Sequence, residues 1–262
     1  MRTGVLVGCT VASLALLALG AVGEECGPEV RAPIVITSDY EFTAENGVVS
    51  GSGIASDPYV IEGGTIDAGY SDYGIRIERT TRYFVIRDLT VSGASKAAIF
   101  LSYVRNGVIQ DCRLVGNWIG VTLNFSSDNR ILRCALESNT DGVHLYFSRE
   151  NRIEECTLSR NDTAIWLDAS HENAVTGNSI SDNHMGVYLD LGSEANTIYR
   201  NTFVDNIHNA HSVTANSWDC DGVGNYWFDY RGIDADENGI GDAPYVIRSQ
   251  GDQDNFPLLA LP

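Results

Sequence analysis

Two carboxylates and a row of ring-bearing side chains are the residues best placed to do chemistry in this sequence. Asp168 and Asp190 are 22 residues apart, and each follows an aromatic residue, Trp166 or Tyr188, by two positions. Two carboxylates held about 5 Å apart can cleave a glycosidic bond with retention of configuration, one as acid and one as nucleophile. Mutual repulsion raises the pKa of one member of such a pair. The alternative is that both are ordinary solvated acids.

The rings recur at the same spacing over a longer stretch, interrupted by Thr122. Aromatic rings bind the apolar C–H faces of sugars, while carboxylates and amides bind sugar hydroxyls. This pattern predicts a carbohydrate-binding surface. Its candidate residues are Phe100, His144, Tyr146, Trp166 and Tyr188. The alternative is that these rings favour β-structure and pack against one another.

An internal repeat must position these residues. A small residue, then Ile or Val, any residue, then Leu or Ile recurs from position 74, with one step of 24 residues followed by steps of 22. Cysteines 112, 134 and 156 keep the same phase. Asparagine recurs in phase at Asn117, Asn139, Asn161, Asn183 and Asn206, and again at Asn129, Asn151, Asn173 and Asn196.

The repeat predicts an all-β fold, a right-handed single-stranded parallel β-helix with two short strands in each coil of about 22 residues. Turns rich in Asn, Gly, Ser and Asp are too frequent for helices, and the leucine consensus of leucine-rich repeats is absent. Equivalent residues then stack in columns, and the asparagines pass amide hydrogen bonds between coils at left-handed turn positions. We expect an N-terminal cap and irregular coils over residues 24–73, regular coils over 74–213 and a C-terminal cap over 214–262.

The start of the chain and its charge indicate export and limit the partners. Residues 1–23 combine an early arginine, an apolar run and closing small residues, the pattern of a signal peptide. A transmembrane anchor is the alternative, although the run is barely long enough to span, and no membrane span is expected in the mature chain. The net charge of −18 excludes nucleic acid and disfavours polyanionic glycans. We expect a secreted, periplasmic or cell-surface protein.

Motifs at both ends resemble those of NosD-like proteins. They are residues 51–62 (GSGIASDPYVIE), 225–230 (NYWFDY), 238–245 (NGIGDAPY) and 254–258 (DNFPL). The resemblance implies a pectin-lyase-like β-helix of the kind found in carbohydrate-binding proteins and sugar hydrolases. The founding members of that family are periplasmic accessory proteins for copper-centre maturation in nitrous oxide reductase. Three functions therefore stand: a carbohydrate-binding or surface-interaction module, a polysaccharide hydrolase or lyase, and a copper-handling accessory protein.

Metal ligands favour a hard cation over copper. Copper needs Met, Cys or His; Met185 is the one methionine after the first residue, the histidines are scattered, and the in-phase cysteines read as small core residues. Copper binding is therefore not expected. Residues 234–242 (DADENGIGD) instead have the alternate oxygen ligands of a calcium loop. The candidate Ca²⁺ ligands are Asp234, Asp236, Asn238, Ile240 and Asp242. The alternative is an acidic turn without metal.

Overall fold

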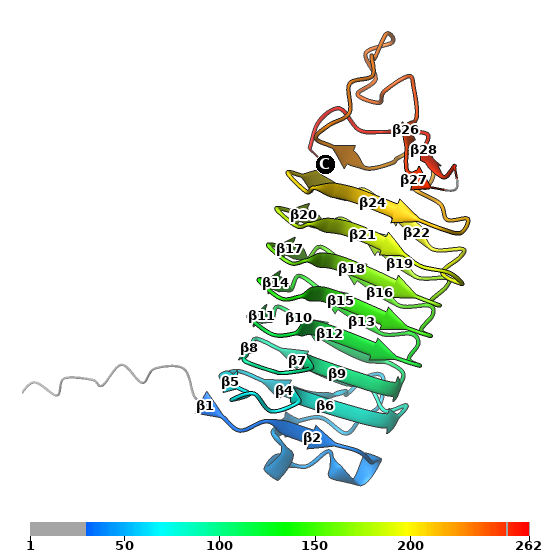
Figure 1. Ribbon diagram of the computed structural model, residues 1–262. Helices are drawn as coiled ribbons and strands as arrows, with labels where there is room; N and C mark the ends of the chain where they lie inside the picture. The colour runs from blue at the N-terminus through cyan, green and yellow to red at the C-terminus, as the bar shows by residue number, and fades with distance from the viewer. Residues whose placement is uncertain (1–29, 250, 262) are drawn as a thin grey trace, which may run out of the picture.

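The computed structural model describes residues 30–249 and 251–261, which form a stack of coils running from the N-terminal to the C-terminal end (Figure 1). The expected signal peptide, residues 1–23, lies outside the described residues. Each regular coil contributes one strand to each of three sheets, which have nine, eight and nine strands among the described residues and are parallel except where β3 joins the second sheet. The predicted β-helix is confirmed.

Each sheet runs along the length of the stack, and its neighbouring strands come from successive coils. The first sheet contains, in spatial order, β1 (Val30–Arg31), β5 (Thr65–Asp67), β8 (Thr90–Ser92), β11 (Arg113–Val115), β14 (Ala135–Glu137), β17 (Thr157–Ser159), β20 (Ser179–Ser181), β23 (Thr202–Val204) and β25 (Tyr226–Trp227). The second contains β22 (Thr197–Tyr199), β19 (Ala174–Thr176), β16 (Arg152–Glu154), β13 (Arg130–Leu132), β10 (Gly107–Gln110), β7 (Phe84–Arg87), β4 (Tyr59–Glu62) and β3 (Val48–Ser50). The third contains β2 (Ile34–Ile36), β6 (Tyr73–Thr80), β9 (Ala97–Val104), β12 (Ile119–Asn124), β15 (Asp141–Tyr146), β18 (Thr163–Asp168), β21 (Met185–Leu189), β24 (His208–Ser212) and β27 (Arg248–Ser249).

The regular coil has three strands, so the expectation of two was wrong. Ile131 and Leu136, two inward residues of one coil, lie in separate strands, β13 and β14. Arg133 separates the two strands with a φ of 49°, in the left-handed region, and Cys134 follows it. Two inward residues five positions apart cannot share one straight strand, because side chains alternate between faces with a period of two. The corner at Arg133 and Cys134 turns the chain between the two strands, so that Ile131 and Leu136 both point into the interior.

Apolar columns fill the interior of the stack. In the third sheet, Val121 pairs with Val143 and Leu123 pairs with Leu145, each directly above the other. All four side chains are completely buried. Full burial of such a side chain contributes about 1.5–3 kcal/mol. Gly142 lies at a close approach between coils, where a Cβ would stand 2.5 Å from the carbonyl oxygen of Ala164.

Asparagine ladders connect the coils, as predicted. The Oδ1 atom of Asn161 accepts the backbone N–H of Asn139 at 3.0 Å, and its Nδ2 donates to the carbonyl of Leu136 at 3.1 Å. The cysteine column at Cys112, Cys134 and Cys156 continues as a third ladder, in which Asn178 accepts the backbone N–H of Cys156 at 2.9 Å. These amides satisfy buried backbone groups at corners that cannot join a sheet.

The left-handed turn residue is the one before the ladder asparagine, rather than the asparagine itself. Asp128, Glu150 and Arg160 precede Asn129, Asn151 and Asn161 and have φ values of 56° each. This turn leaves the asparagine side chain directed into the stack, where it meets the next coil.

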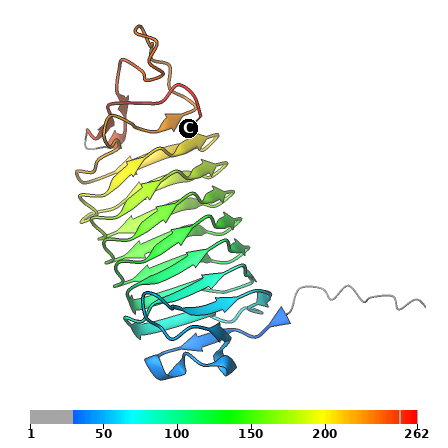
Figure 2. The same ribbon diagram turned by 180° about the vertical axis from the view of Figure 1, so that it is seen from behind.

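Both ends of the stack are covered. At the N-terminal end, the short 3-10 helices η1 (Asp39–Glu41) and η2 (Ala44–Asn46) precede β3, which pairs antiparallel with β4. At the other end, Trp227 is stacked between Phe203 and Tyr245, with ring centroids 4.3 and 4.1 Å away. The antiparallel pair β26 (Tyr245–Val246) and β28 (Gln253–Asp254) belongs to this end. The orange loop extends beyond the last coil in both views (Figures 1 and 2).

Candidate functional site

The outer face of the third sheet, meaning the outward side chains of β6 through β24, carries the residues singled out above. The strand register places Phe100, Thr122, His144, Trp166, Tyr188 and His211 in one column. It places Ser102, Asn124, Tyr146 and Asp168 in the next. The structure therefore brings the predicted carbohydrate-binding residues together on one face. Sugar binding there stays a prediction.

The rings do not form a flat platform, because they stack on one another in pairs. His144 and Trp166 lie 4.5 Å apart at an interplanar angle of 3°, and Tyr188 and His211 lie 5.0 Å apart at 16°. Trp166 meets Tyr188 edge-on, at 72°. Each parallel pair covers one face of each of its rings. A ligand can reach only the ring edges and the faces at the ends of the pairs.

His144 lies in an unusually dry part of this face. Burial lowers its pKa to about 4, so the imidazole is neutral near pH 7. Its Nε2 atom and the Nε1 atom of Trp166 are buried without hydrogen-bond partners among the described residues. A neutral imidazole can stack on an indole in this buried position at a small cost in desolvation free energy, whereas a protonated imidazole would lose the hydration of its charge.

Asp168 is the last residue of β18, and Asp190 directly follows β21 on the next coil, where its backbone N–H donates to the Leu167 carbonyl at 2.9 Å. Partial burial and the negative charge of Asp190 raise the pKa of Asp168. Asp190 uses its Oδ1 atom to accept the backbone N–H of Leu191 at 2.7 Å. A raised pKa is what the general acid of such a pair requires, and Asp168 is the member that has it. Catalysis by this pair stays a prediction.

Asp141 is a further buried acid on this face that sequence reasoning did not identify. It is 6% exposed, and burial together with the charge of Asp162 raises its pKa to about 6. It begins the strand that carries His144 and pairs with Ile119 and Thr163 on its two sides. The sequence did contain a signal for this buried acid. Asp141 shares its register with Ile119, Thr163 and Met185, which carry no charge.

A second column of rings, also missed, lies at the C-terminal ends of the third-sheet strands. Tyr103, Phe125 and Phe147 are stacked with centroids 5.1 and 5.2 Å apart. They are 55%, 42% and 48% exposed. Each has a left-handed φ, between 46° and 55°, which is costly for a bulky residue. Their 22-residue spacing could have revealed the column.

Two groups of soft metal ligands can be distinguished among the described residues. Cys112, Cys134 and Cys156 are buried free thiols, and the Sγ atoms of the latter two lie 3.6 and 3.7 Å from backbone carbonyls. Contact with Cys134 and burial raise the pKa of Cys112 and of Cys156 well above the ordinary value. These thiols are core residues, as expected.

The second group lies on the last coils of the outer face. Met185 pairs with His208 across β21 and β24, and the ring of His184 lies 5.7 Å from that of His208. Sequence reasoning treated these histidines as scattered. The 23-residue step between Met185 and His208 was the signal that they share a register.

The predicted calcium loop is an exposed turn held by its own polar groups. Asp234 accepts the backbone N–H groups of Gly239 at 2.9 Å and Asn238 at 3.0 Å, which lowers its pKa. Asp242 accepts that of Ala235 at 2.8 Å. In residues 30–249 and 251–261, no three His, Cys, Asp or Glu side chains are grouped as a metal site. Calcium binding by Asp234, Asp236, Asn238, Ile240 and Asp242 stays a prediction.

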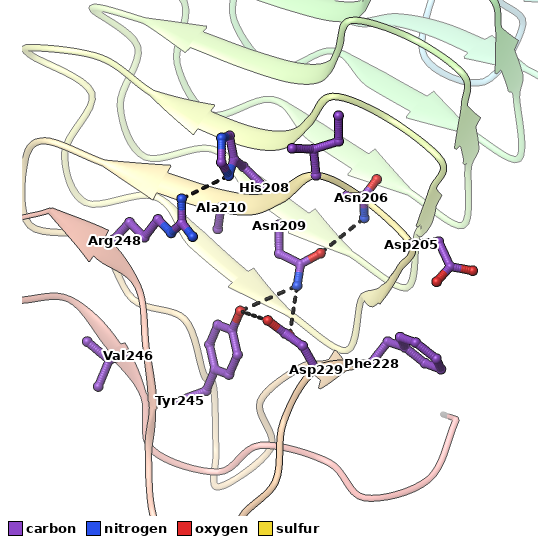
Figure 3. A pocket seen from close by; sticks show the side chains of 11 residues that line it. Asp205, Asn206, His208, Asn209, Ala210, Phe228, Asp229, Tyr245, Val246 and Arg248 are labelled. Carbon is purple, nitrogen blue, oxygen red and sulfur yellow. Dashed lines mark hydrogen bonds between the residues drawn. The ribbon is translucent and has the colours of Figure 1, made fainter.

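A cleft of about 420 Å³ separates the last coil from the C-terminal cap (Figure 3). Asn209 donates to Asp229 at 2.9 Å and to the Tyr245 hydroxyl at 3.3 Å, while Arg248 donates to the Nδ1 atom of His208 at 2.9 Å. Burial raises the pKa of Tyr245 to about 12. These groups bind one another across the cleft, so their visible role is to fasten the cap to the coil.

Comparison with known proteins gives the family. The family model described as "Periplasmic copper-binding protein (NosD)" matches residues 34–232, well over half of the chain. The chain belongs to the NosD family. The probable ABC transporter binding protein NosD of Pseudomonas aeruginosa is 40% identical to this NosD-family protein over 27% of this chain and 26% of its own length. The corresponding protein of Stutzerimonas stutzeri is 32% identical over 27% and 25%. The match therefore spans about a quarter of each curated relative.

Solved structures similar to this NosD-family protein share its fold. The A-module of the mannuronan C-5 epimerase AlgE6 from Azotobacter vinelandii has a TM-score of 0.55 at 18% identity, covering 60% of this chain and 50% of that one. The periplasmic alginate epimerase AlgG has a TM-score of 0.51 at 20% identity, covering 62% and 44%. Identity this low establishes the β-helix and no more. Within residues 30–249 and 251–261, no helix has the length and apolar character needed to cross a membrane.

Proposed function

We propose that this NosD-family protein is exported and binds a polysaccharide along the outer face of its third sheet. The observation that carries the proposal is the alignment, on adjacent coils, of rings and hydrogen-bonding side chains in two parallel columns. Coils repeat at the strand spacing of about 4.8 Å. A β-linked chain of pyranoses advances by a similar distance per sugar, so successive sugars can meet equivalent side chains.

The stacked pairs define how such a chain would bind. Sugars would lie over the exposed ring edges of His144 and Trp166 and over ring faces where a pair ends. Asn124, Tyr146 and Asp168 flank the rings and provide hydrogen bonds to hydroxyls. The net charge of −18 favours a neutral polysaccharide over a polyuronate.

A glycan screen with matched variants tests this function. Trp166→Ala and Tyr188→Ala are expected to weaken binding of the captured glycan at least tenfold, whereas Tyr199→Ala, an aromatic change on the second sheet, leaves it unchanged. Equal binding by all three variants, or no binding to any neutral polysaccharide by the native protein, would contradict the proposal.

Copper binding is a second candidate, favoured by the placement of His184 and Met185 on one coil beside His208 on the next. Thioether and imidazole ligands suit Cu(I). We expect one Cu(I) per chain in competition with a chromogenic chelator. His208→Ala and Met185→Ala would lower the affinity at least tenfold, and His171→Ala, a histidine outside this group, would not. Failure to bind an equimolar amount of Cu(I) would remove this candidate.

A further inference from the structure

The two histidines of the copper candidate make opposite kinds of hydrogen bond through their Nδ1 atoms. The Nδ1 atom of His184 lies 3.1 Å from a carboxylate oxygen of Asp162. The Nδ1 atom of His208 lies 2.9 Å from a guanidinium nitrogen of Arg248. An ionised carboxylate only accepts hydrogen bonds, and a guanidinium only donates them. The first bond therefore requires a proton on Nδ1 of His184, and the second requires an unprotonated Nδ1 on His208.

His184 is in the tautomer that a metal ligand needs. In a neutral imidazole, a proton on Nδ1 leaves the lone pair of Nε2 available to a metal. A carboxylate that holds the other ring N–H of a ligating histidine is common in metal sites, because it fixes the tautomer and the orientation of the ring. Asp162 has this position on the preceding coil. Met185, which directly follows His184, adds a thioether that suits Cu(I).

His208 is in the opposite tautomer. Because its Nδ1 accepts from Arg248, the neutral ring carries its proton on Nε2, and neither nitrogen has a lone pair available to a metal. Copper bound at Nδ1 would take the place of the guanidinium. Copper bound at Nε2 would displace the proton to Nδ1 by exchange with water, and a protonated Nδ1 cannot accept from Arg248. Both routes remove the contact between His208 and Arg248.

Arg248 connects this contact to the C-terminal cap. It begins β27, which pairs with β24 of the last coil. Ile247, the residue before it, is 2% exposed and anchors the backbone here in the core. The Arg248 side chain is exposed and reaches His208 from the cap side of the cleft (Figure 3). The guanidinium can therefore leave His208 while the backbone of β27 stays in place.

We propose that Arg248 is a gate on copper binding, because its contact with His208 excludes the binding of Cu(I) by His184, Met185 and His208. This inference rests on copper binding, the second function proposed above, and adds the regulation of that site. The positive charge of the guanidinium also opposes a cation bound beside it.

The coupling between the gate and copper is reciprocal. To the extent that the Arg248 contact weakens Cu(I) binding, bound Cu(I) weakens the Arg248 contact by the same factor. A cap fastened through Arg248 therefore promotes copper release, and bound copper loosens this fastening. The contacts of Asn209 with Asp229 and Tyr245 hold the cap independently of it.

The Cu(I) affinity of the full chain, measured by competition with a chromogenic chelator, tests the gate. Arg248→Leu removes the donor and the charge without adding a metal ligand, and we expect the Kd for Cu(I) to fall about tenfold. Arg248→Lys keeps a charged donor and should change the Kd by less than about threefold. Arg200→Leu is the charge-matched control, because Arg200 follows β22 in the second sheet, and it should leave the Kd unchanged. Circular dichroism checks that each variant retains the β-helix.

Nitrogen-15 NMR of the histidine rings at about pH 8 reads the tautomers directly. In the metal-free protein we expect the ring proton on Nδ1 of His184 and on Nε2 of His208, and equimolar Cu(I) should change the His208 tautomer or bind its Nδ1. A Kd for Arg248→Leu equal to or above the native value would overturn the gate and leave copper binding standing. A proton on Nδ1 of His208 in the metal-free native protein would also overturn it. If the native protein fails to bind equimolar Cu(I), the copper candidate itself is contradicted.

Discussion

Replacing Asn161 by alanine removes the middle of a ladder and should destabilise the protein strongly. The Asn161 side chain is 3% exposed and makes four hydrogen bonds. Its Oδ1 atom accepts the backbone N–H and the Nδ2 of Asn139, and its Nδ2 donates to the Leu136 carbonyl and to Asn183. Alanine would leave the Asn139 N–H and the Leu136 carbonyl buried without these partners.

The magnitude follows from those two orphaned backbone groups. An unsatisfied buried donor or acceptor costs about 1–3 kcal/mol, so the expected loss in free energy of unfolding is about 3–5 kcal/mol. Asn206→Ala is the matched control, because Asn206 ends the same column and is half-buried. Water can replace its hydrogen bonds, and we expect a loss of about 1–2 kcal/mol.

Equilibrium unfolding in urea measures both variants, with the midpoint and slope fitted together. Hydrogen exchange at the Asn139 amide reports the local effect and should accelerate in Asn161→Ala more than at amides two coils away. Equal losses in the two variants, or a loss below about 1 kcal/mol for Asn161→Ala, would refute the view that the ladder stabilises through satisfied buried backbone groups.

Three further predictions concern buried groups. Burial and the charge of Asp162 raise the pKa of Asp141 to about 6, so the protonated carboxyl stabilises the fold fully below the unfolded pKa of about 4, and this stabilisation is lost as the pH rises through 6. In urea unfolding, Asp141→Asn should be more stable than the native chain by about 2–3 kcal/mol at pH 8 and indistinguishable from it at pH 3.5. Burial lowers the pKa of His144 to about 4, so the free energy of unfolding should fall as the pH drops from 6.5 through 4. His144→Phe should avoid about 3 kcal/mol of this loss. An imidazole NMR titration of His144 centred near 6.5 would contradict this prediction. Cys112, Cys134 and Cys156 are at most 2% exposed, so in the native protein a thiol reagent followed by peptide mapping should modify Cys220 well before these three, and early labelling of Cys134 would show that the coils open locally.

The NosD signature at the C-terminal end has a physical role that the motif alone did not reveal. Asp254 accepts the backbone N–H of Asn225 at 2.7 Å and the indole N–H of Trp227 at 2.8 Å. Asn225 is the last amide of the ladder that begins with the cysteine column. The carboxylate of Asp254 therefore terminates the ladder and orients the tryptophan that covers the final coil.

The sequence by itself determined the β-helix and the columns, because a period of about 22 residues with short strands and turn-rich corners stacks equivalent residues of successive coils. His144, Trp166 and Tyr188 could be assigned to one outward column from spacing and alternation alone. The same reasoning could not predict the third strand of the coil. The corner before that strand depends on a left-handed φ at Arg133, and the residue type arginine does not indicate such a φ.

Only the tertiary structure decided how the columns are used. Spacing cannot state that His144 stacks flat on Trp166 while Tyr188 turns edge-on, because ring rotation depends on contacts with both neighbouring coils. Nor could it show that Asp141 is buried and that its pKa is raised, since burial of an outward residue depends on side chains from adjacent coils.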